Sequence, residues 1–409
     1  MDIVKTGDGL FMVKNRTLFL LDYCLTPYDK ITTCGILCEK GKIIATGGAS
    51  AFALDEEGLE VIELKNAYAI PGLIDSHIHG IGMADSADAS KGARPLHEMS
   101  KLLAQHGVTT FCPTLVSLPE KDMLSAVENL VREIEEGCPM ADTCGIHLEG
   151  PFLNPNKRGS QKAENIRPVD LGFARELIQA GKHHIRLMTF APELEHSIEL
   201  VELLLENGII PSMGHSEATE KETLDCVDAG VRRCTYVFNG MPPLNHREIS
   251  LTTVALTDDR ISVELIADGI HVTPRMMDLV HRSKPQGKLI GISNSVVPAD
   301  TAARAANDVV DTTPRIIRSA DGRIIGSTLT LEHSWHHLVQ YAKMPVEEAA
   351  ACLTINPARD LGLITRGELF PGRRADITVF DTNTHEVRMT VSRGNVVYEK
   401  TCEGTIHRK

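Results

Sequence analysis

Short apolar runs alternate with amphipathic segments from residue 69 to about residue 295. Most of the runs are rich in Val, Ile, Thr or Leu, which is typical of strands covered on both faces. Strands separated by helices pair in parallel through right-handed crossovers, and eight of them close naturally into a TIM (β/α)8 barrel of the α/β class. The predicted strands are residues 69–80, 107–116, 143–152, 185–193, 208–216, 232–240, 261–271 and 288–295.

Helical patterns fill several intervals between these runs, and several of them end in Gly, the usual residue of a left-handed helix C-cap. An open doubly wound sheet is the alternative arrangement. The barrel is favoured because polar residues stand at the C-terminal ends of nearly all eight runs. The predicted helices are residues 97–107, 122–137, 170–181, 195–208 and 220–230.

The two ends of the chain have a different pattern, in which short β-like pieces alternate with Gly and Pro turn signals. We therefore predict a small β-sandwich domain built from both termini, residues 1–68 and 366–409. A barrel hydrolase domain over residues 69–365 interrupts it, and residues 330–362 hold two further helical stretches.

The composition limits the partners of the chain. Its 409 residues carry a formal net charge of −13 without a Lys/Arg-rich block, which argues against a nucleic-acid partner but leaves a small anionic substrate possible. The first residues lack an apolar stretch after a basic start, and no apolar run approaches the roughly 20 residues that span a bilayer. We expect a cytoplasmic protein with no membrane partner.

Cysteines are scattered through the chain without CxxC pairs, so we expect reduced, buried thiols and no disulfide framework. The ten are Cys24, Cys34, Cys38, Cys112, Cys138, Cys144, Cys226, Cys234, Cys352 and Cys402.

Candidate metal ligands stand at three predicted strand ends. The first run ends in His77-x-His79, and residues i and i+2 of a strand point the same way. Glu149 ends the third run and His215 the fifth. A lone HxH pair or a lone Glu is often structural, but barrel active sites lie at these strand ends. Together the four residues predict a divalent metal site that suits Zn²⁺, with Fe²⁺, Co²⁺ or Mn²⁺ as alternatives.

Several longer motifs occur in order along the chain: PGLIDSHIHG, HLEGPF, MGHSEAT, NGMPPLNHRE, LIADGIH and a late GELFPGRRADITVFD. The whole chain resembles the N-acetylglucosamine-6-phosphate deacetylase family of the amidohydrolase superfamily. The resemblance implies a barrel with an interrupted β-sandwich, a homodimer, and release of acetate from an N-acetylated amino-sugar 6-phosphate. In that chemistry a metal-activated water attacks the acetyl carbonyl, and a carboxylate on the eighth strand carries the protons.

The resemblance also implies roles for individual residues. Glu149 and His215 match metal ligands of the family, and His77 and His79 match a first-strand pair that only some members have. The residues that match substrate-binding positions are Asn239, Gly240, Arg247 and His271. In the family, the matching Arg and His reach the phosphate from the neighbouring subunit.

Three positions depart from the family pattern. Tyr236 stands where a metal-binding His is expected, and a phenol with a pKa of about 10 is a poor ligand. Gln161 stands at the position of the carbonyl-polarising His, and Asn294 at that of the catalytic Asp. Gln donates only uncharged hydrogen bonds, and Asn has no titratable proton. Asp300 and Glu217 are nearby acidic substitutes.

Three functions are compatible with these residues. The chain is a deacetylase of amino-sugar phosphates with weakened or altered activity, a catalytically silent paralogue that binds such a phosphate, or an amidohydrolase of a different amide.

Overall fold

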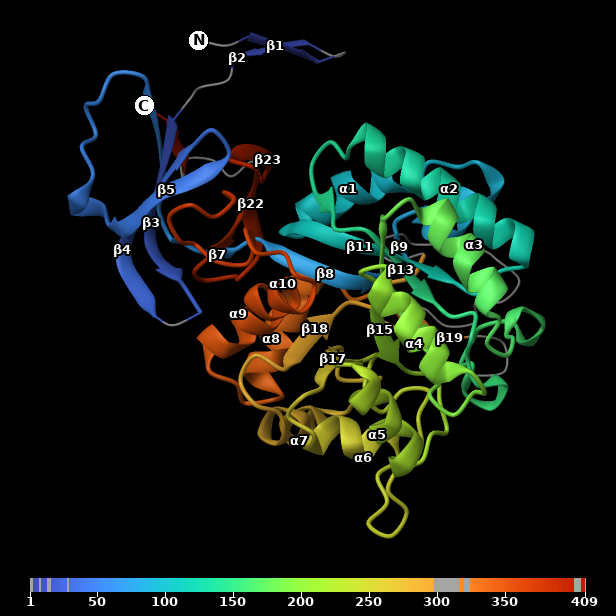
Figure 1. Ribbon diagram of the computed structural model, residues 1–409. Helices are drawn as coiled ribbons and strands as arrows, with labels where there is room; N and C mark the ends of the chain where they lie inside the picture. Colours follow the sequence, from blue (N-terminus) through green and yellow to red (C-terminus); the bar gives the residue numbers. More distant parts are fainter. Residues whose placement is uncertain are drawn as a thin grey trace.

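The computed structural model describes residues 16–27, 29–297, 317–318 and 324–400, and the backbone alone of residues 3–6, 9–12, 316 and 406–408. Figure 1 shows a barrel ringed by helices, with a separate β-domain in which the first and last parts of the chain lie together. None of the described helices combines the length and the apolar composition that crossing a bilayer requires.

Eight parallel strands form the barrel, each hydrogen-bonded to the next in chain order. They are β8 (Leu73–Ile78), β11 (Val108–Val116), β13 (Ile146–Glu149), β14 (Ile185–Phe190), β15 (Ile210–Met213), β16 (Arg233–Cys234), β17 (Ser262–Ile266) and β18 (Leu289–Ile292). Backbone bonds close the ring beyond β18, because Asn294 N–H donates to the His77 carbonyl at 3.1 Å and His79 N–H donates to the Ser295 carbonyl at 2.9 Å. The predicted barrel is confirmed, and the open-sheet alternative is wrong.

Helices cover the outside of the barrel, and the five predicted ones are present. Two more, α6 and α7, lie in segments that were not predicted as helices, and the late segment holds three helices where two were predicted. The helices are α1 (Pro95–Gln105), α2 (Glu120–Glu136), α3 (Leu171–Gly181), α4 (Ser197–Glu206), α5 (Glu220–Ala229), α6 (Leu251–Thr257), α7 (Pro274–Ser283), α8 (Leu331–Gln340), α9 (Val346–Leu353) and α10 (Ile355–Asp360).

The terminal domain is one sheet whose strands come from both ends of the chain. Its strands are β3 (Arg16–Leu25), β4 (Lys30–Glu39), β5 (Lys42–Gly48), β6 (Leu59–Leu64), β7 (Ala67–Pro71), β21 (Ile377–Asp381), β22 (Val387–Ser392), β23 (Asn395–Glu399) and β24 (Ile406–Arg408). The first half of β3 pairs with β6 and its second half pairs with β7, so the sheet branches at β3. Buried residues such as Phe19, Ile36 and Ile377 form a core of their own in this domain.

The remaining strands form short pairs outside these sheets. They are β1 (Ile3–Thr6) with β2 (Gly9–Met12), β9 (Gly80–Ile81) with β10 (Ala84–Asp85), and β19 (Ile316–Arg318) with β20 (Ile324–Ser327). The two-residue strand β12 (Asp142–Thr143) belongs to the barrel sheet, where it pairs with β11. Nine of the ten cysteines are described, and all nine are buried free thiols, as predicted.

The predicted run 69–80 contains two strands that belong to different sheets. Pro71 at the end of β7 pairs with Ile377 of the terminal sheet, whereas Leu73 begins the barrel strand β8. Gly72 between them donates its N–H to the Asp376 carbonyl at 2.9 Å. Residues 1–68 with 366–409, and residues 69–365, remain our proposal for the limits of the two domains.

A side chain at Gly72 should destabilise this junction. A Cβ there would lie 2.2 Å from Oγ1 of the buried Thr109, whereas a Cβ at Gly47 meets no atom within 4 Å. We expect Gly72→Ala to lower the free energy of unfolding by about 1–3 kcal/mol, as in other overpacked sites. Gly47→Ala should change it by about 0.5 kcal/mol or less. Equal urea midpoints for the two variants would contradict the close approach.

Candidate active site

The four predicted metal-binding side chains lie at the C-terminal ends of three barrel strands. His77 lies in β8, and His79 follows that strand directly. Glu149 is the last residue of β13, and His215 lies two residues beyond β15. All four side chains are buried. Parallel barrel strands end on one rim, which brings these four side chains together as predicted. We call them the rim cluster.

Three of these side chains approach one another closely enough to hold one cation. The ligand atoms of His77, His79 and Glu149 all lie within 4.8 Å of one another. Nε2 of His77 is 3.7 Å from Oε1 of Glu149, and Nε2 of His79 is 3.7 Å from Oε2. Nitrogen and oxygen ligands lie about 2.0–2.2 Å from Zn²⁺, so donor atoms at this separation can bind the same ion.

Buried atoms without partners support the fit of a cation at this cluster. Within the described part of the chain, Nε2 of His77 and Oδ1 of Asn294 are buried and have no well-aligned hydrogen-bond partner. Such atoms cost free energy unless a partner reaches them. Burial lowers the pKa of His79 to about 4. Burial alone would raise the pKa of Glu149, but the hydrogen bond with His215 helps to hold that pKa well below its usual range. Neutral imidazole and ionised carboxylate are the forms that bind metals.

A buried chain of charges fixes the orientation of His77. Nδ1 of His77 lies 2.9 Å from Oε2 of Glu264, and Arg233 donates to the other oxygen of Glu264. The three side chains are fully buried. Burial would raise the pKa of Glu264, but mainly the charge of Arg233 lowers it to about 2. The carboxylate therefore accepts a hydrogen bond from the Nδ1–H group of His77, and Nε2 is left facing Glu149.

Glu264 and Arg233 were missed by the sequence reasoning. Each is a charged residue inside an otherwise apolar predicted strand, and a buried charge requires a partner. That conflict with the apolar pattern was the available signal.

Gln161, at the position of the family's carbonyl-polarising His, contacts Glu149 of the rim cluster. Its Nε2 donates to Oε2 of Glu149 at 2.8 Å and approaches the Glu149 carbonyl at 3.3 Å. Its Oε1 accepts the backbone N–H of Ser117 at 2.9 Å. The amide is therefore held at both ends, and it orients the Glu149 carboxylate.

Asn294 lies on the rim beyond β18, beside the His77–His79 pair. Its backbone carbonyl accepts the N–H of Ser327 at 3.1 Å, and its φ of 45° is a left-handed conformation that Asn tolerates. The buried side chain brings a neutral amide to the rim, where it can donate or accept hydrogen bonds but cannot titrate.

Tyr236 connects Glu149 and His215. Its hydroxyl hydrogen-bonds both Oε1 of Glu149 and Nε2 of His215. The other ring nitrogen of His215, Nδ1, donates to the Lys157 carbonyl at 2.5 Å. Burial and the charge of Glu149 raise the pKa of Tyr236 well above its usual value, so the phenol is protonated at neutral pH.

The residues that match substrate-binding positions are spread over several loops. Gly240, with a φ of 60°, packs against His215, because a Cβ on it would lie 3.0 Å from Nδ1 of that ring. Asn239 is next to it and is half-buried. His271 is held by Asp268, whose Oδ2 is 2.6 Å from Nδ1. Arg247 is exposed in the loop between β16 and α6, outside the rim cluster.

Of the two acidic substitutes, Glu217 does not join the cluster. Glu217 accepts hydrogen bonds from Asn154 and Asn156, at 3.4 and 3.3 Å, and lies 3.7 Å from Lys157. Asp300 lies outside the described residues.

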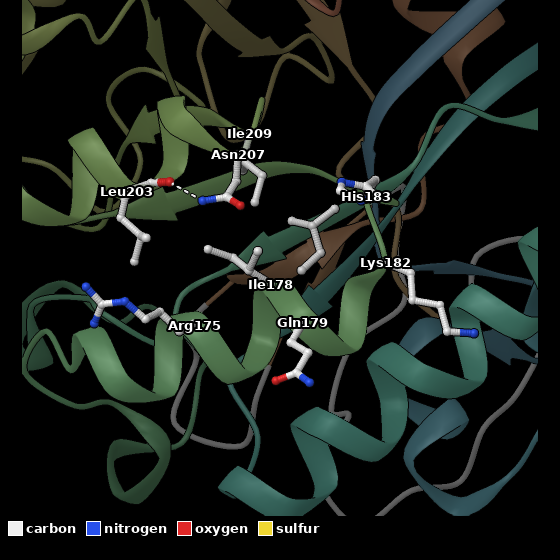
Figure 2. A pocket seen from close by; sticks show the side chains of 9 residues that line it. Arg175, Ile178, Gln179, Lys182, His183, Leu203, Asn207 and Ile209 are labelled. Carbon is white, nitrogen blue, oxygen red and sulfur yellow. Dashed lines mark hydrogen bonds between the residues drawn. The ribbon is translucent and has the colours of Figure 1, made fainter.

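A surface hollow of about 590 Å³ lies away from this rim, between α3 and α4. Figure 2 shows its lining, with Ile178 between Arg175 and Leu203 on one side and Lys182 on the other. Because Ile185 begins β14, the hollow lies towards the N-terminal ends of the strands. Barrel active sites occupy the opposite end, so the rim cluster is the candidate active site.

Comparison with known proteins defines the class first. Residues 68–397 match the Amidohydrolase family. The barrel and the rim cluster described above fall within this match.

Individual relatives are more specific. An N-acetylglucosamine-6-phosphate deacetylase of Bacillus subtilis (strain 168) is 34% identical over 83% of this chain and 87% of its own length. An N-acetylgalactosamine-6-phosphate deacetylase of Escherichia coli O157:H7 is 29% identical over 81% of this chain and 89% of its own length. A Mycobacterium smegmatis deacetylase variant, solved in complex with N-acetyl-D-glucosamine-6-phosphate, is 28% identical with a TM-score of 0.84 over 94% of this chain and 99% of that one. The chain therefore belongs to the amidohydrolase family and, within it, to the N-acetylglucosamine-6-phosphate deacetylases.

Glu264→Gln tests the support of His77. The variant keeps the side-chain volume but removes the charge that Nδ1 and Arg233 face. We expect the affinity for Zn²⁺, measured against a competing chelator, to fall about 10–100-fold, as for other lost partners of ligating imidazoles.

The matched control is Glu332→Gln, which weakens a buried carboxylate–imidazole pair with His106, 2.7 Å long and outside the rim cluster. That variant should lose stability but keep its zinc affinity. Equal zinc affinity in Glu264→Gln and the unaltered protein would contradict the proposal that Glu264 orients His77.

Proposed function

We propose that this chain is a metal-dependent amidohydrolase that releases acetate from an N-acetylated amino-sugar 6-phosphate, with slow turnover. The observation that supports this most is the convergence of His77, His79 and Glu149 on the rim of a deacetylase-family barrel. The mixed nitrogen and oxygen donors suit Zn²⁺ best, with Fe²⁺, Co²⁺ or Mn²⁺ as alternatives. His77, His79 and Glu149 would hold the cation, which would supply an activated water and polarise the amide carbonyl.

Slow turnover follows from two replaced groups. The Gln161 amide donates to Glu149, both to its carboxylate and towards its carbonyl, so this side chain is not free to polarise a substrate carbonyl. Asn294 cannot take a proton from water or give one to a leaving amine. General acid–base catalysis typically contributes about 10²–10⁴-fold to a rate, which sets the expected scale of the loss.

We further propose that substrate phosphate is bound across a cytoplasmic homodimer. Arg247 is exposed on a loop that leaves the barrel after β16 and therefore can reach a second subunit. Its planar guanidinium can bind two phosphate oxygens at once. We assign Asn239, Gly240 and His271 to contacts with the sugar.

A second candidate function is the binding of an amino-sugar phosphate without turnover. The replacements at Gln161, Tyr236 and Asn294 favour it, because they alter catalytic groups and leave Arg247 and His271 in place. A third candidate is hydrolysis of a different amide.

Acetate release separates these functions. We expect zinc-loaded protein to release acetate from N-acetylglucosamine 6-phosphate or N-acetylgalactosamine 6-phosphate about 10²–10⁴-fold more slowly than the Bacillus subtilis relative. Chelation of the metal should abolish release. Arg247→Ala should raise KM for the phosphorylated sugars but not for N-acetylglucosamine.

The other outcomes decide between the alternatives. No acetate, together with a higher melting temperature in the presence of the sugar phosphate, would establish the binding function. If the protein neither releases acetate nor melts at a higher temperature with the sugar phosphate, hydrolysis of a different amide is the remaining function.

Asn294→Asp tests how much of the lost activity lies at one position. The variant restores a group that can carry a proton, but Gln161 and Tyr236 stay as they are. We expect kcat to rise about tenfold or less, with Asn294→Leu as a control of similar size that should not raise it. Recovery to the rate of the Bacillus subtilis relative would show that Asn294 is the sole defect.

A further inference from the structure

Glu149 lies between the imidazoles of His77 and His79 and the imidazole of His215. Its Oε2 faces His79, and its Oε1 lies 3.7 Å from Nε2 of His77 and 3.2 Å from Nε2 of His215. A carboxylate in this position can bridge two cations, one on each side, as in two-metal hydrolase sites. We call the side of His77 and His79 the first position, and the side of His215 and Tyr236 the second position.

The first position is open to an ion. Its three ligand atoms lie within 4.8 Å of one another, and Nε2 of His77 has no hydrogen-bond partner within the described part of the chain. Asn294 adds a buried amide oxygen beside His79 that has no well-aligned hydrogen-bond partner among these residues.

The second position is filled by a side chain. The Tyr236 hydroxyl hydrogen-bonds Oε1 of Glu149 and Nε2 of His215, the two atoms that would otherwise bind an ion there. His215 cannot turn its other nitrogen towards the site without breaking the bond from Nδ1 to the Lys157 carbonyl.

The Tyr236 ring is held firmly in this place. It packs with Ile266, Ile290 and Ile292, and its own backbone N–H donates to Oε2 of Glu264 at 3.3 Å. The phenol is 6% exposed, so water does not compete freely for its hydroxyl. Movement of the hydroxyl away from Glu149 and His215 would break two buried hydrogen bonds at once.

We propose that the Tyr236 phenol takes the place of a second cation between Glu149 and His215, and so restricts this chain to one ion at His77, His79 and Glu149. The inference rests on the proposed metal-dependent function. It removes His215 from the set of ligands and makes it a hydrogen-bond partner of Tyr236.

Metal counting tests the proposal without reference to activity. Purified protein is stripped with a chelator, reloaded with Co²⁺ or Zn²⁺, passed over a desalting column and analysed for ions per chain by mass spectrometry. We expect one ion in the unaltered protein, one in Tyr236→Phe, one in His215→Ala and none in His77→Ala. Tyr236→His should bind two ions.

Three results would overturn the proposal. They are two ions in the unaltered protein, loss of the ion in Tyr236→Phe or His215→Ala, and a single ion in a Tyr236→His protein that melts as cooperatively as the unaltered one. Absence of any ion from the unaltered protein would instead reject the metal-dependent function itself, so the two failures are distinguishable.

Discussion

The carboxylate of Glu149 is the group on which the candidate active site depends, because every other side chain of the rim cluster is placed relative to it. Gln161 and Tyr236 donate to it, and the imidazoles stand on either side of it. Its position depends on Gly150, whose φ of 100° turns the chain directly after the strand. A Cβ on that glycine would lie 2.4 Å from Oγ of Ser117, so another residue there would displace β13 and the carboxylate together.

Beneath this carboxylate, the buried charges serve orientation more than stability. Arg233 binds both Glu264 and Asp360, and Glu264 binds His77. Burying such ions costs about as much as their attraction returns, although removing one partner typically costs about 3–5 kcal/mol. The chain of charges holds the His77 imidazole of β8 in one orientation. It also links that imidazole to Glu264 of β17 and Arg233 of β16. The two-residue strand β16 is thereby held in the barrel by side chains as well as by its ladder.

The sequence was sufficient for the barrel and for the His77–His79 pair, because buried strands are continuous apolar runs and residues i and i+2 share a face. The sequence pattern gave wrong element limits or types where the spacing of the apolar residues was ambiguous. The run 69–80 reads as one strand although Gly72 divides it, and α6 is short and rich in β-branched residues that favour strands. The contacts of Gln161 and Tyr236 could not be predicted, because loops deliver both side chains and no periodicity specifies where a loop side chain points.

The three departures from the family pattern become physically consistent once the two sides of Glu149 are separated. Two divalent cations around one carboxylate would leave a large uncompensated charge in a buried site, which is costly. Asn294 in place of an acidic residue lowers the negative charge available on the rim, and the neutral phenol of Tyr236 lowers the number of cations to be balanced. Glu264 is not free to balance a cation, because Arg233 already donates to its carboxylate. Asn294 weakens the binding of a second cation without preventing it, and the phenol of Tyr236 fills the place that such a cation would take. Together they fit a site of one ion, in which Gln161 keeps the Glu149 carboxylate in place.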